Sequence, residues 1–377
     1  MKKKIINVIT PTYFPAVNGV SFVVQRNVQA LLFLGFDVNV LTCENSQSFG
    51  TENVYTFDIS GNGTLINPII GNVKFFITTL RYLSNSAEMN IFHTWHSWST
   101  NSFMQNEIFT NCKNIIYSHG TSFSSYENIF RRLMRNFLYI SQKNILKSNI
   151  HKFDAMISIV ENTKHPRCYD AKIYKGMRFV IPNPIPDRKV TNYYKLTYRE
   201  KLFRNNNKTA LCISNFEDIK NQQFLVRAIS EYDLNLVLVA SKITSYYNKV
   251  NNFIQKNNLS DRIKILIDIS DDQVQNLYET CDFFAFASKN DFSPLVLIES
   301  KRNKLPFISF ITADIDSTGG FFCKTNREYS VALESIISMS DSELNLLGIK
   351  GYENFLNNNS NELYIQKINN ALNKLLY

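Results

Sequence analysis

Two carboxylates eight residues apart, Asp291 and Glu299, flank the point where a strand passes into a helix. The segment 283–308 reads FFAFASKNDFSPLVLIESKRNKLPFI, and its apolar start predicts a buried strand. Ser293 is a favoured N-cap and Pro294 a favoured first helical residue, so we expect the helix to begin there. The free N–H groups and positive dipole end of such a helix bind phosphate groups. The segment therefore predicts an anion site.

Glu299 follows the apolar run 295–298, so its carboxylate needs polar partners at the edge of a cleft. The hydroxyls of a sugar or a ribose would supply them. Asp291 lies on the loop before the helix, so the two carboxylates would approach one ligand from different sides. The alternative is an exposed loop aspartate and a helix glutamate without a role.

The segment resembles the E-x7-E region of retaining GT-B glycosyltransferases, in particular glycosyltransferase family 4. The family pattern is close to E-G-F-P-L-V-L-L-E-A-x-A-x-G-x-P-V-I. The residues in register with it are Asp291, Pro294, Leu295, Val296, Leu297, Ile298, Glu299 and Pro306. The resemblance implies that Asp291 binds the hydroxyls of the donor sugar, that Glu299 binds the ribose, and that 292–295 line the donor site.

This segment departs from the family pattern at two positions. Asp291 stands where the family has glutamate, and Phe292 stands where it has glycine. The shorter acid implies a different sugar or weaker donor binding.

A second anion site is predicted where the strand 209–215 leads through a turn to an apolar helix. The segment is similar to the family's G-R-L-x-x-x-K motif, whose Arg and Lys neutralise the donor diphosphate. Lys220 matches the lysine and Asn215 takes the place of the arginine. The alternative for Lys220 is a solvated lysine at a helix start. By the same resemblance, the strand 262–267 ends at Ile267, beside the nucleotide base.

The chain opens with a predicted strand, helix and strand at 5–10, 21–34 and 37–42. The loop before the helix contains Gly19, where a missing side chain lets a ligand approach the backbone. It is similar to the family's P-x-x-G-G loop against the donor diphosphate, with Asn18 for the first glycine. Because G-x-G-x-x-G is absent from the sequence, a nicotinamide dehydrogenase is disfavoured.

Two predicted strands, 90–96 and 114–121, contain three histidines, which are His93, His96 and His119. The ends of these strands should open on one cleft. The strands resemble the family's H-x-H and H-G-T strands, which implies that His119 lies beside the donor sugar and the reaction centre. His93 and His96 would orient the acceptor loop or serve the structure alone. A metal site is disfavoured because no Asp-x-Asp partner accompanies them.

Length and composition favour a two-domain globular protein. The chain has 377 residues, of which 44% are hydrophobic and 19% charged. The apolar part of the start is too short for a signal peptide, and no apolar stretch approaches the ~20 residues that span a bilayer. Six scattered cysteines without a C-x-x-C pair disfavour zinc and disulfides, so we expect a reduced cytoplasm.

The net charge of +9 is uneven, since residues 1–188 carry 19 Lys and Arg against 11 Asp and Glu. Much of it comes from the stretch 131–152, which contains Arg131, Arg132 and Arg135, no acid and several apolar residues. Such a basic amphipathic stretch suits an anionic membrane surface. The alternative is a surface helix whose apolar side is the domain core. Nucleic acid is disfavoured because no binding motif accompanies the charge.

Together these observations predict an α/β protein with the GT-B fold, two Rossmann-like doubly wound domains facing a central cleft. We expect an acceptor domain at 1–186, a donor domain at 187–355 and a helix at 356–377 that crosses back to the first domain.

The resemblance implies retaining transfer from a nucleotide-diphosphate sugar, with UDP favoured, to a lipid-linked or cell-surface glycan, as in O-antigen or capsule synthesis. The implied catalytic residues are His119, Asp291 and Lys220, with no metal or other cofactor, and the expected place is the inner face of the cell membrane. The alternatives are a non-catalytic GT-B subunit that supports an active partner and, less favoured, a sugar-nucleotide epimerase.

Overall fold

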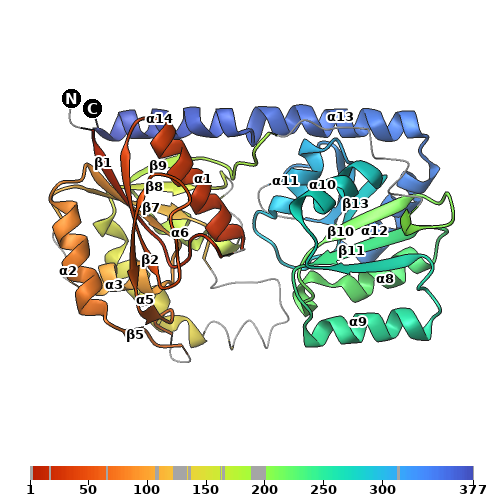
Figure 1. Cartoon of the computed structure of the whole chain (residues 1–377), viewed down its shortest axis with the longest axis horizontal. Coiled ribbons are helices and arrows are strands. Elements are labelled where there is room, and N and C mark those ends of the chain that lie inside the picture. Colours follow the sequence, from red (N-terminus) through yellow and green to blue (C-terminus); the bar gives the residue numbers. More distant parts are fainter. Residues whose placement is uncertain are drawn as a thin grey trace. The chain divides into compact units, whose positions relative to one another are not determined.

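The computed structural model divides the chain into two compact units, Met1–Pro184 together with Glu362–Tyr377, and Ile185–Asn361 (Figure 1). Each unit holds a sheet of parallel strands with helices packed against it, which confirms the predicted α/β class. The structure describes residues 3–16, 18–64, 67–106, 110–121, 134, 137–161, 163, 166–187, 201–311 and 315–376.

In the described part of the first unit, seven parallel strands form a sheet in the order β3-β2-β1-β6-β7-β8-β9. Its central strands are buried along almost their whole length, because both faces of a parallel sheet are covered. They are β1 (Ile5–Ile9), β2 (Asp37–Cys43), β3 (Asn53–Phe57), β6 (Met89–His93), β7 (Lys113–Ser118), β8 (Ala155–Ser158) and β9 (Met177–Val180). A small antiparallel pair, β4 (Ile59–Ser60) and β5 (Ile70–Gly71), lies apart from this sheet.

Helix α1 (Gly19–Phe33) begins two residues before its predicted start, because Asn18 caps it through a hydrogen bond from the Ser21 N–H. Gly35, with φ of +88°, follows its end and allows the chain to turn there. The other helices of this unit are α2 (Val73–Ser84), α3 (Trp98–Gln105), α5 (Ile140–Asn149), α6 (Tyr169–Ile173) and α14 (Asn361–Leu376), with short 3-10 turns at Ile150–Lys152 and Pro166–Cys168.

A row of asparagines crosses the first sheet on one of its faces. Asn7 donates to Asn90 and accepts from Asn39, at 2.9 Å in both cases. The row continues to Asn53 on β3 and to Asn114 on β7, so neighbouring strands are joined by side-chain amides in register. A slip of one residue would turn an asparagine to the other face and leave buried amides without partners. The row therefore fixes the register of five strands.

The described part of the second unit contains a six-stranded parallel sheet in the order β12-β11-β10-β13-β14-β15. Alternate strand residues pack into two separate cores, with Leu236 in one and Val237 in the other. The strands are β10 (Thr209–Ile213), β11 (Asn235–Ala240), β12 (Ile263–Ile267), β13 (Phe283–Phe286), β14 (Phe307–Phe310) and β15 (Gly320–Cys323).

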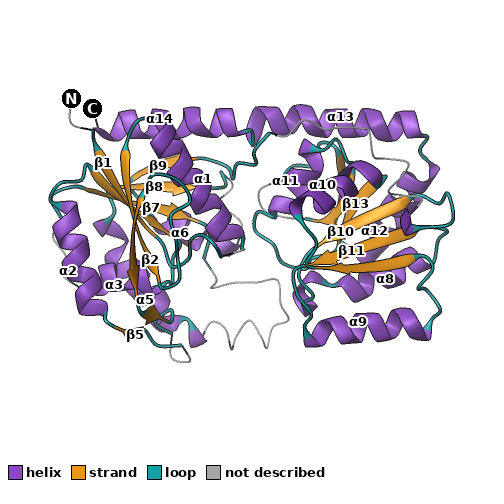
Figure 2. Ribbon diagram, viewed as in Figure 1, coloured by secondary structure: helices purple, strands orange, loops and turns teal. Residues whose placement is uncertain are grey.

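Helices cover both faces of the second sheet. Helices α8 and α9 lie on one side of its strands, and α10 and α11 lie on the other (Figure 2). The bounds are α8 (Gln222–Ser230), α9 (Ser245–Lys256), α10 (Asp271–Thr280), α11 (Leu295–Arg302), α12 (Asn326–Ser338) and α13 (Asp341–Asn358), with a 3-10 turn at Asp218–Lys220.

Two sequence predictions need correction. The strand predicted at 90–96 ends at His93, because Thr94 and His96 take positive φ angles of 69° and 57° that a strand cannot contain. The helix predicted at 356–377 starts later, because α13 continues to Asn358 and α14 begins only at Asn361. At the start of the predicted donor domain, 188–200 lie outside the described residues.

The asparagine row yields a prediction for stability. Replacing Asn7 with Ala should lower the free energy of unfolding of the first unit by about 2 to 4 kcal/mol, because two buried hydrogen bonds vanish. Both tryptophans of the chain, Trp95 and Trp98, are buried in this unit, so urea unfolding followed by tryptophan fluorescence measures it. The exposed Asn53→Ala variant at the end of the row should lose less than about 1 kcal/mol. Equal losses in the two variants would contradict a role in register.

Candidate functional site

Lys220 and Asp291 form an ion pair in the second unit. The Lys220 Nζ donates to both carboxylate oxygens of Asp291 at 2.9 Å. The two side chains are 22% and 18% exposed, so the pair is half-buried and still reachable from solvent. The Lys220 ammonium also lies 5.7 Å from the centre of the Phe286 ring. Two residues that the sequence singled out in separate motifs thus meet in space.

The sheet topology explains this meeting. Strands β10 and β13 are parallel neighbours, so the segments that follow them leave the same edge of the sheet. The two loops are then joined by the Lys289 N–H, which donates to the Ile219 carbonyl at 2.8 Å, and by the Ser288 hydroxyl. A cation from one loop and a carboxylate from the other are therefore held side by side at the carboxyl ends of the strands.

The start of helix α11 differs from its prediction. Pro294, not Ser293, is the cap residue, and the first helical residue is Leu295. Pro294 keeps an extended ψ of 112°, and its carbonyl accepts the Leu297 N–H at 3.1 Å. A proline side chain offers no acceptor, so this end of the helix lacks a side-chain cap hydrogen bond.

Glu299 lies in the second turn of α11 and is half-buried, as its apolar surroundings predict. The buried Tyr278 hydroxyl donates to its carboxylate at 2.8 Å. Burial, and then the charge of Glu299, raise the pKa of Tyr278 well above its ordinary value, so the phenol remains a neutral donor. Tyr278 was not predicted from the sequence, because a tyrosine beside Leu277 on an amphipathic helix is typical of a core residue.

Three other donor-site candidates of the second unit, Asn215, Phe292 and Ile267, differ in their surroundings. The Asn215 side chain accepts from the Ser241 hydroxyl at 2.6 Å, which joins the loop after β10 to the end of β11. Phe292 is buried, and Ile267 is the last residue of the edge strand β12. Asn215 therefore holds its loop, and the structure does not bring it to the Lys220 and Asp291 pair by any hydrogen bond.

Two of the three histidines meet in the first unit. The His93 Nδ1 lies 3.1 Å from the His119 Nε2, and both rings stack on Tyr117 with centroid separations of 4.7 and 5.2 Å. Burial lowers the pKa of His119 to about 4 and lowers the pKa of His93 well below its ordinary value. Both imidazoles are therefore neutral near pH 7.

His96 contacts a different helix. Its Nδ1 is 3.3 Å from the Gln142 side-chain oxygen on α5, and burial lowers its pKa to about 4. Asn27 on α1, which sequence analysis did not single out, reaches the His93 Nε2 at 3.2 Å. In the sequence, the signal that could have found Asn27 is an asparagine among the apolar residues of α1.

The structure describes Gly19 but not the three arginines of the basic stretch. Gly19 is the exposed first residue of α1, directly after the Asn18 cap. The three arginines predicted to meet a membrane lie outside the described residues; they are Arg131, Arg132 and Arg135.

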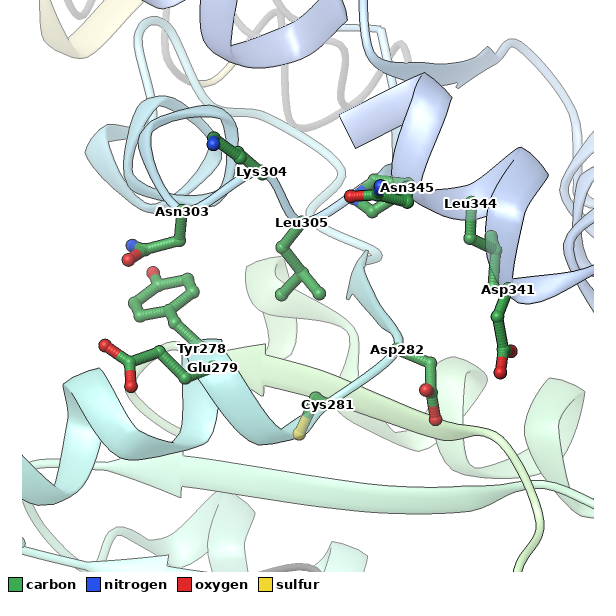
Figure 3. A pocket seen from close by; sticks show the side chains of 11 residues that line it. Tyr278, Glu279, Cys281, Asp282, Asn303, Lys304, Leu305, Asp341, Leu344 and Asn345 are labelled. Carbon is green, nitrogen blue, oxygen red and sulfur yellow. The ribbon is translucent and has the colours of Figure 1, made fainter. Parts of the chain in front are cut away.

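A pocket of about 250 Å³ lies elsewhere in the second unit (Figure 3). It is lined by Asp282 and Pro306, which immediately precede β13 and β14, and by Asp341 and Leu344 at the start of α13. It therefore opens at the amino ends of these strands, whereas Lys220 and Asp291 follow the carboxyl ends. We do not assign the chemistry to this pocket, because ligands of such sheets bind at the carboxyl ends.

Comparison with known proteins bears on this arrangement. Residues 195–339 match the family Glycosyl transferases group 1. The matched segment contains Lys220, Asp291 and Glu299, and together with the fold it supports a GT-B glycosyltransferase. No curated protein sequence matches the chain.

Solved structures share the fold over the whole chain. Sucrose-phosphate synthase from Thermosynechococcus elongatus superposes with a TM-score of 0.79 at 16% identity, covering 99% of each chain. A glycosyltransferase from Rickettsia africae ESF-5 gives 0.70 at 18% identity, covering 100% of this chain and 99% of that one. Anabaena HepE in complex with UDP and glucose gives 0.71 at 15% identity, covering 99% of this chain and 100% of that one. The two sheets are thus those of GT-B proteins.

Two further findings concern the part of the chain that the structure describes. None of the helices there combines the length and the apolar character that crossing a membrane requires. That same part of the chain holds no group of three or more His, Cys, Asp or Glu that could bind a metal ion.

The buried neutral His96 predicts a pH dependence of stability. The unfolded chain protonates this histidine near pH 6.5 and the folded chain only near 4, so stability falls as pH decreases through this window. At pH 5 the loss from His96 is about 2 kcal/mol relative to pH 8. Urea unfolding followed by tryptophan fluorescence should therefore show a shallower loss between pH 8 and 5 in His96→Gln. The exposed His151→Gln variant serves as control, and parallel losses in wild type and His96→Gln would refute the prediction.

Proposed function

We propose that this protein is a retaining glycosyltransferase that uses a nucleotide-diphosphate sugar as donor. The observation that carries the proposal is the Lys220 and Asp291 pair, held by two adjoining loops inside the matched segment 195–339. A cation for a diphosphate and a carboxylate for sugar hydroxyls are the two groups that this donor requires. The neighbouring α11 adds a helix N-terminus on the same loop.

In the proposed reaction the bound diphosphate competes with Asp291 for Lys220. The Lys220 ammonium turns to the diphosphate, whose charge grows as the glycosidic bond breaks, and Asp291 is released to accept hydrogen bonds from the sugar. The ion pair at 2.9 Å keeps both side chains ordered until then. Electrostatic stabilisation of the leaving group by Lys220 and α11 is the largest contribution to the rate in this proposal. No metal is required, because Lys220 supplies the positive charge.

Glu299 binds the ribose of the donor in this proposal. The Tyr278 hydroxyl holds one carboxylate oxygen, Oε2, and so fixes the orientation of the carboxylate on α11. Gly19 and His119 of the first unit are proposed to contact the diphosphate and the donor sugar. The base favoured is uracil, which is supported by the UDP bound to the structurally similar Anabaena HepE.

The acceptor is proposed to be a lipid-linked or cell-surface glycan intermediate, reached from the inner face of the membrane. Support comes from three apolar side chains within the basic stretch. Met134, Phe137 and Ile140 are 50%, 66% and 56% exposed and recur every three residues. The basic residues Lys143 and Lys147 follow on α5. Exposed apolar residues beside cations suit an anionic bilayer, whereas a core helix would bury them.

A second candidate is a non-catalytic GT-B subunit that binds sugar nucleotide or membrane and supports an active partner. Asn215 favours it, because this residue stands where the resemblance places an arginine and is bound to Ser241. With one cation fewer, the leaving group would be stabilised less. Turnover of any nucleotide sugar by the isolated chain decides against this candidate.

The donor-site assignment predicts the effect of removing either acid. Asp291→Ala and Glu299→Ala should each reduce turnover of the preferred UDP-sugar by about 10²-fold, because donor hydroxyls lose a charged partner in a half-buried site. Release of UDP from a panel of UDP-sugars, with a chelator present, provides the measurement. Glu353→Ala is the control, since Glu353 is an exposed acid on α13 of the same unit. Wild-type turnover in either variant, or restoration of activity only by magnesium or manganese, would overturn the assignment.

The membrane assignment predicts binding to anionic liposomes. The wild-type chain should sediment with vesicles that contain phosphatidylglycerol at low salt and less at high salt, since each cation contributes roughly 1 kcal/mol near such a surface. Changing Arg131, Arg132 and Arg135 together to Gln, or Phe137 and Ile140 together to Ser, should reduce the sedimented fraction several-fold.

The control for the apolar change replaces Phe33 and Tyr82 with Ser, because each is 76% exposed elsewhere on the first unit. If the wild type stays in solution, or if both test variants sediment like the wild type, the acceptor is soluble and the basic stretch is a solvated surface.

A further inference from the structure

A buried chain of hydrogen bonds connects the last helix of the chain to His119 within the first unit. Tyr364 on α14 accepts from the Asn27 side-chain Nδ2 at 3.2 Å. The Asn27 Oδ1 lies 3.2 Å from the His93 Nε2, and the His93 Nδ1 lies 3.1 Å from the His119 Nε2. Asn27 and His93 are fully buried, so water does not interrupt the chain.

The direction of each hydrogen bond follows from the one before it. Because the Asn27 Nδ2 donates to Tyr364, the Oδ1 faces His93 and can only accept. The His93 Nε2 must then carry the proton, which leaves a lone pair on its Nδ1. That lone pair accepts from the His119 Nε2. The His119 Nδ1 is thereby left unprotonated, and within the described part of the chain it has no protein hydrogen-bond partner.

The surroundings keep both rings neutral. Tyr117 stacks on both of them, and Tyr364 reaches them through Asn27. Burial raises the pKa of Tyr364 to about 12, so this hydroxyl carries no charge near pH 7. A neutral imidazole with one fixed lone pair is a hydrogen-bond acceptor and not a cation.

We propose that Asn27 and Tyr364 are positioning residues that fix the tautomer of His119 through His93, so that the His119 Nδ1 accepts a hydrogen bond from a sugar hydroxyl. The choice of a hydroxyl as ligand rests on the proposed glycosyl transfer, whereas the tautomer chain rests on the geometry alone. It makes α14 part of the site, since this helix contributes the hydroxyl that orients Asn27. Removing that hydroxyl frees the Asn27 amide to rotate and to present a donor to His93.

The test is nitrogen-15 NMR of the full chain labelled at its five histidines, recorded from pH 8 to pH 5. Two-bond couplings between ring protons and nitrogens report which nitrogen carries the proton. In the wild type, His93 and His119 should both be protonated at Nε2. In Asn27→Leu the acceptor is lost and both rings should switch to the Nδ1-protonated form. Tyr364→Phe should give a mixture of the two forms.

Asn27→Asp separates positioning from packing. Its carboxylate still accepts from the His93 Nε2, so both rings should keep the wild-type tautomer at pH 8. The negative charge favours the imidazolium, so the titration of the pair should move to higher pH by a unit or more. The control is Tyr174→Phe, which removes another buried hydroxyl of the same unit, bonded to the Phe153 carbonyl at 3.1 Å. This control should leave all histidine signals of the pair in place.

Turnover of the UDP-sugar gives the second readout. Asn27→Leu should reduce it about 10-fold at every pH, whereas Asn27→Asp should match the wild type at pH 8 and lose activity as pH falls. Unchanged histidine tautomers in both Asn27→Leu and Tyr364→Phe would overturn the proposal. A tautomer switch in a chain that turns over no nucleotide sugar would instead retain the hydrogen-bond chain and reject the proposed glycosyl transfer.

Discussion

The ion pair between Lys220 and Asp291 is the interaction on which this account of the protein depends. It exists because β10 and β13 are parallel neighbours, so that loops 71 residues apart in the chain leave one edge of the sheet together. A half-buried pair of this kind contributes little net stability, because desolvation of both charges offsets most of their attraction. A role in donor binding explains the ion pair better, since each side chain can leave its partner and bind a group of the donor instead.

In the first unit, neutral polar groups take the place that the ion pair has in the second. Its asparagine row, centred on Asn7, fixes the strand register, and that register brings the ends of β6 and β7 together. His93 and His119 follow from those ends and form one hydrogen-bonded pair. Burial keeps both rings uncharged, so the direction of hydrogen bonding is set by the amide of Asn27 and not by a carboxylate. The two units therefore present charged groups in one case and an oriented neutral acceptor in the other.

Sequence patterns predicted the α/β class, most strands to within a few residues, and the residues that now meet as Lys220 and Asp291. They failed where long-range contacts decide. Tyr278, Asn27 and Tyr364 each look like ordinary core or helix residues, and only the fold brings them to Glu299 and His93. The cap of α11 was placed one residue early because serine is the better capping side chain, yet Pro294 holds the extended backbone angle there. His96 was grouped with His93 because they are near in sequence, but positive φ angles at Thr94 and His96 turn the backbone after β6.

Equilibrium binding of nucleotides shows whether Lys220 holds a diphosphate. Calorimetric titration of the full chain with UDP, ADP and GDP, each beside its nucleoside and with a chelator present, measures the contribution of the diphosphate. We expect one nucleoside diphosphate, with UDP favoured, to bind at least about 10-fold more tightly than its nucleoside, and Lys220→Ala to remove most of this difference. Equal affinity for nucleoside and diphosphate in the wild type, or an unchanged difference in Lys220→Ala, would contradict this expectation.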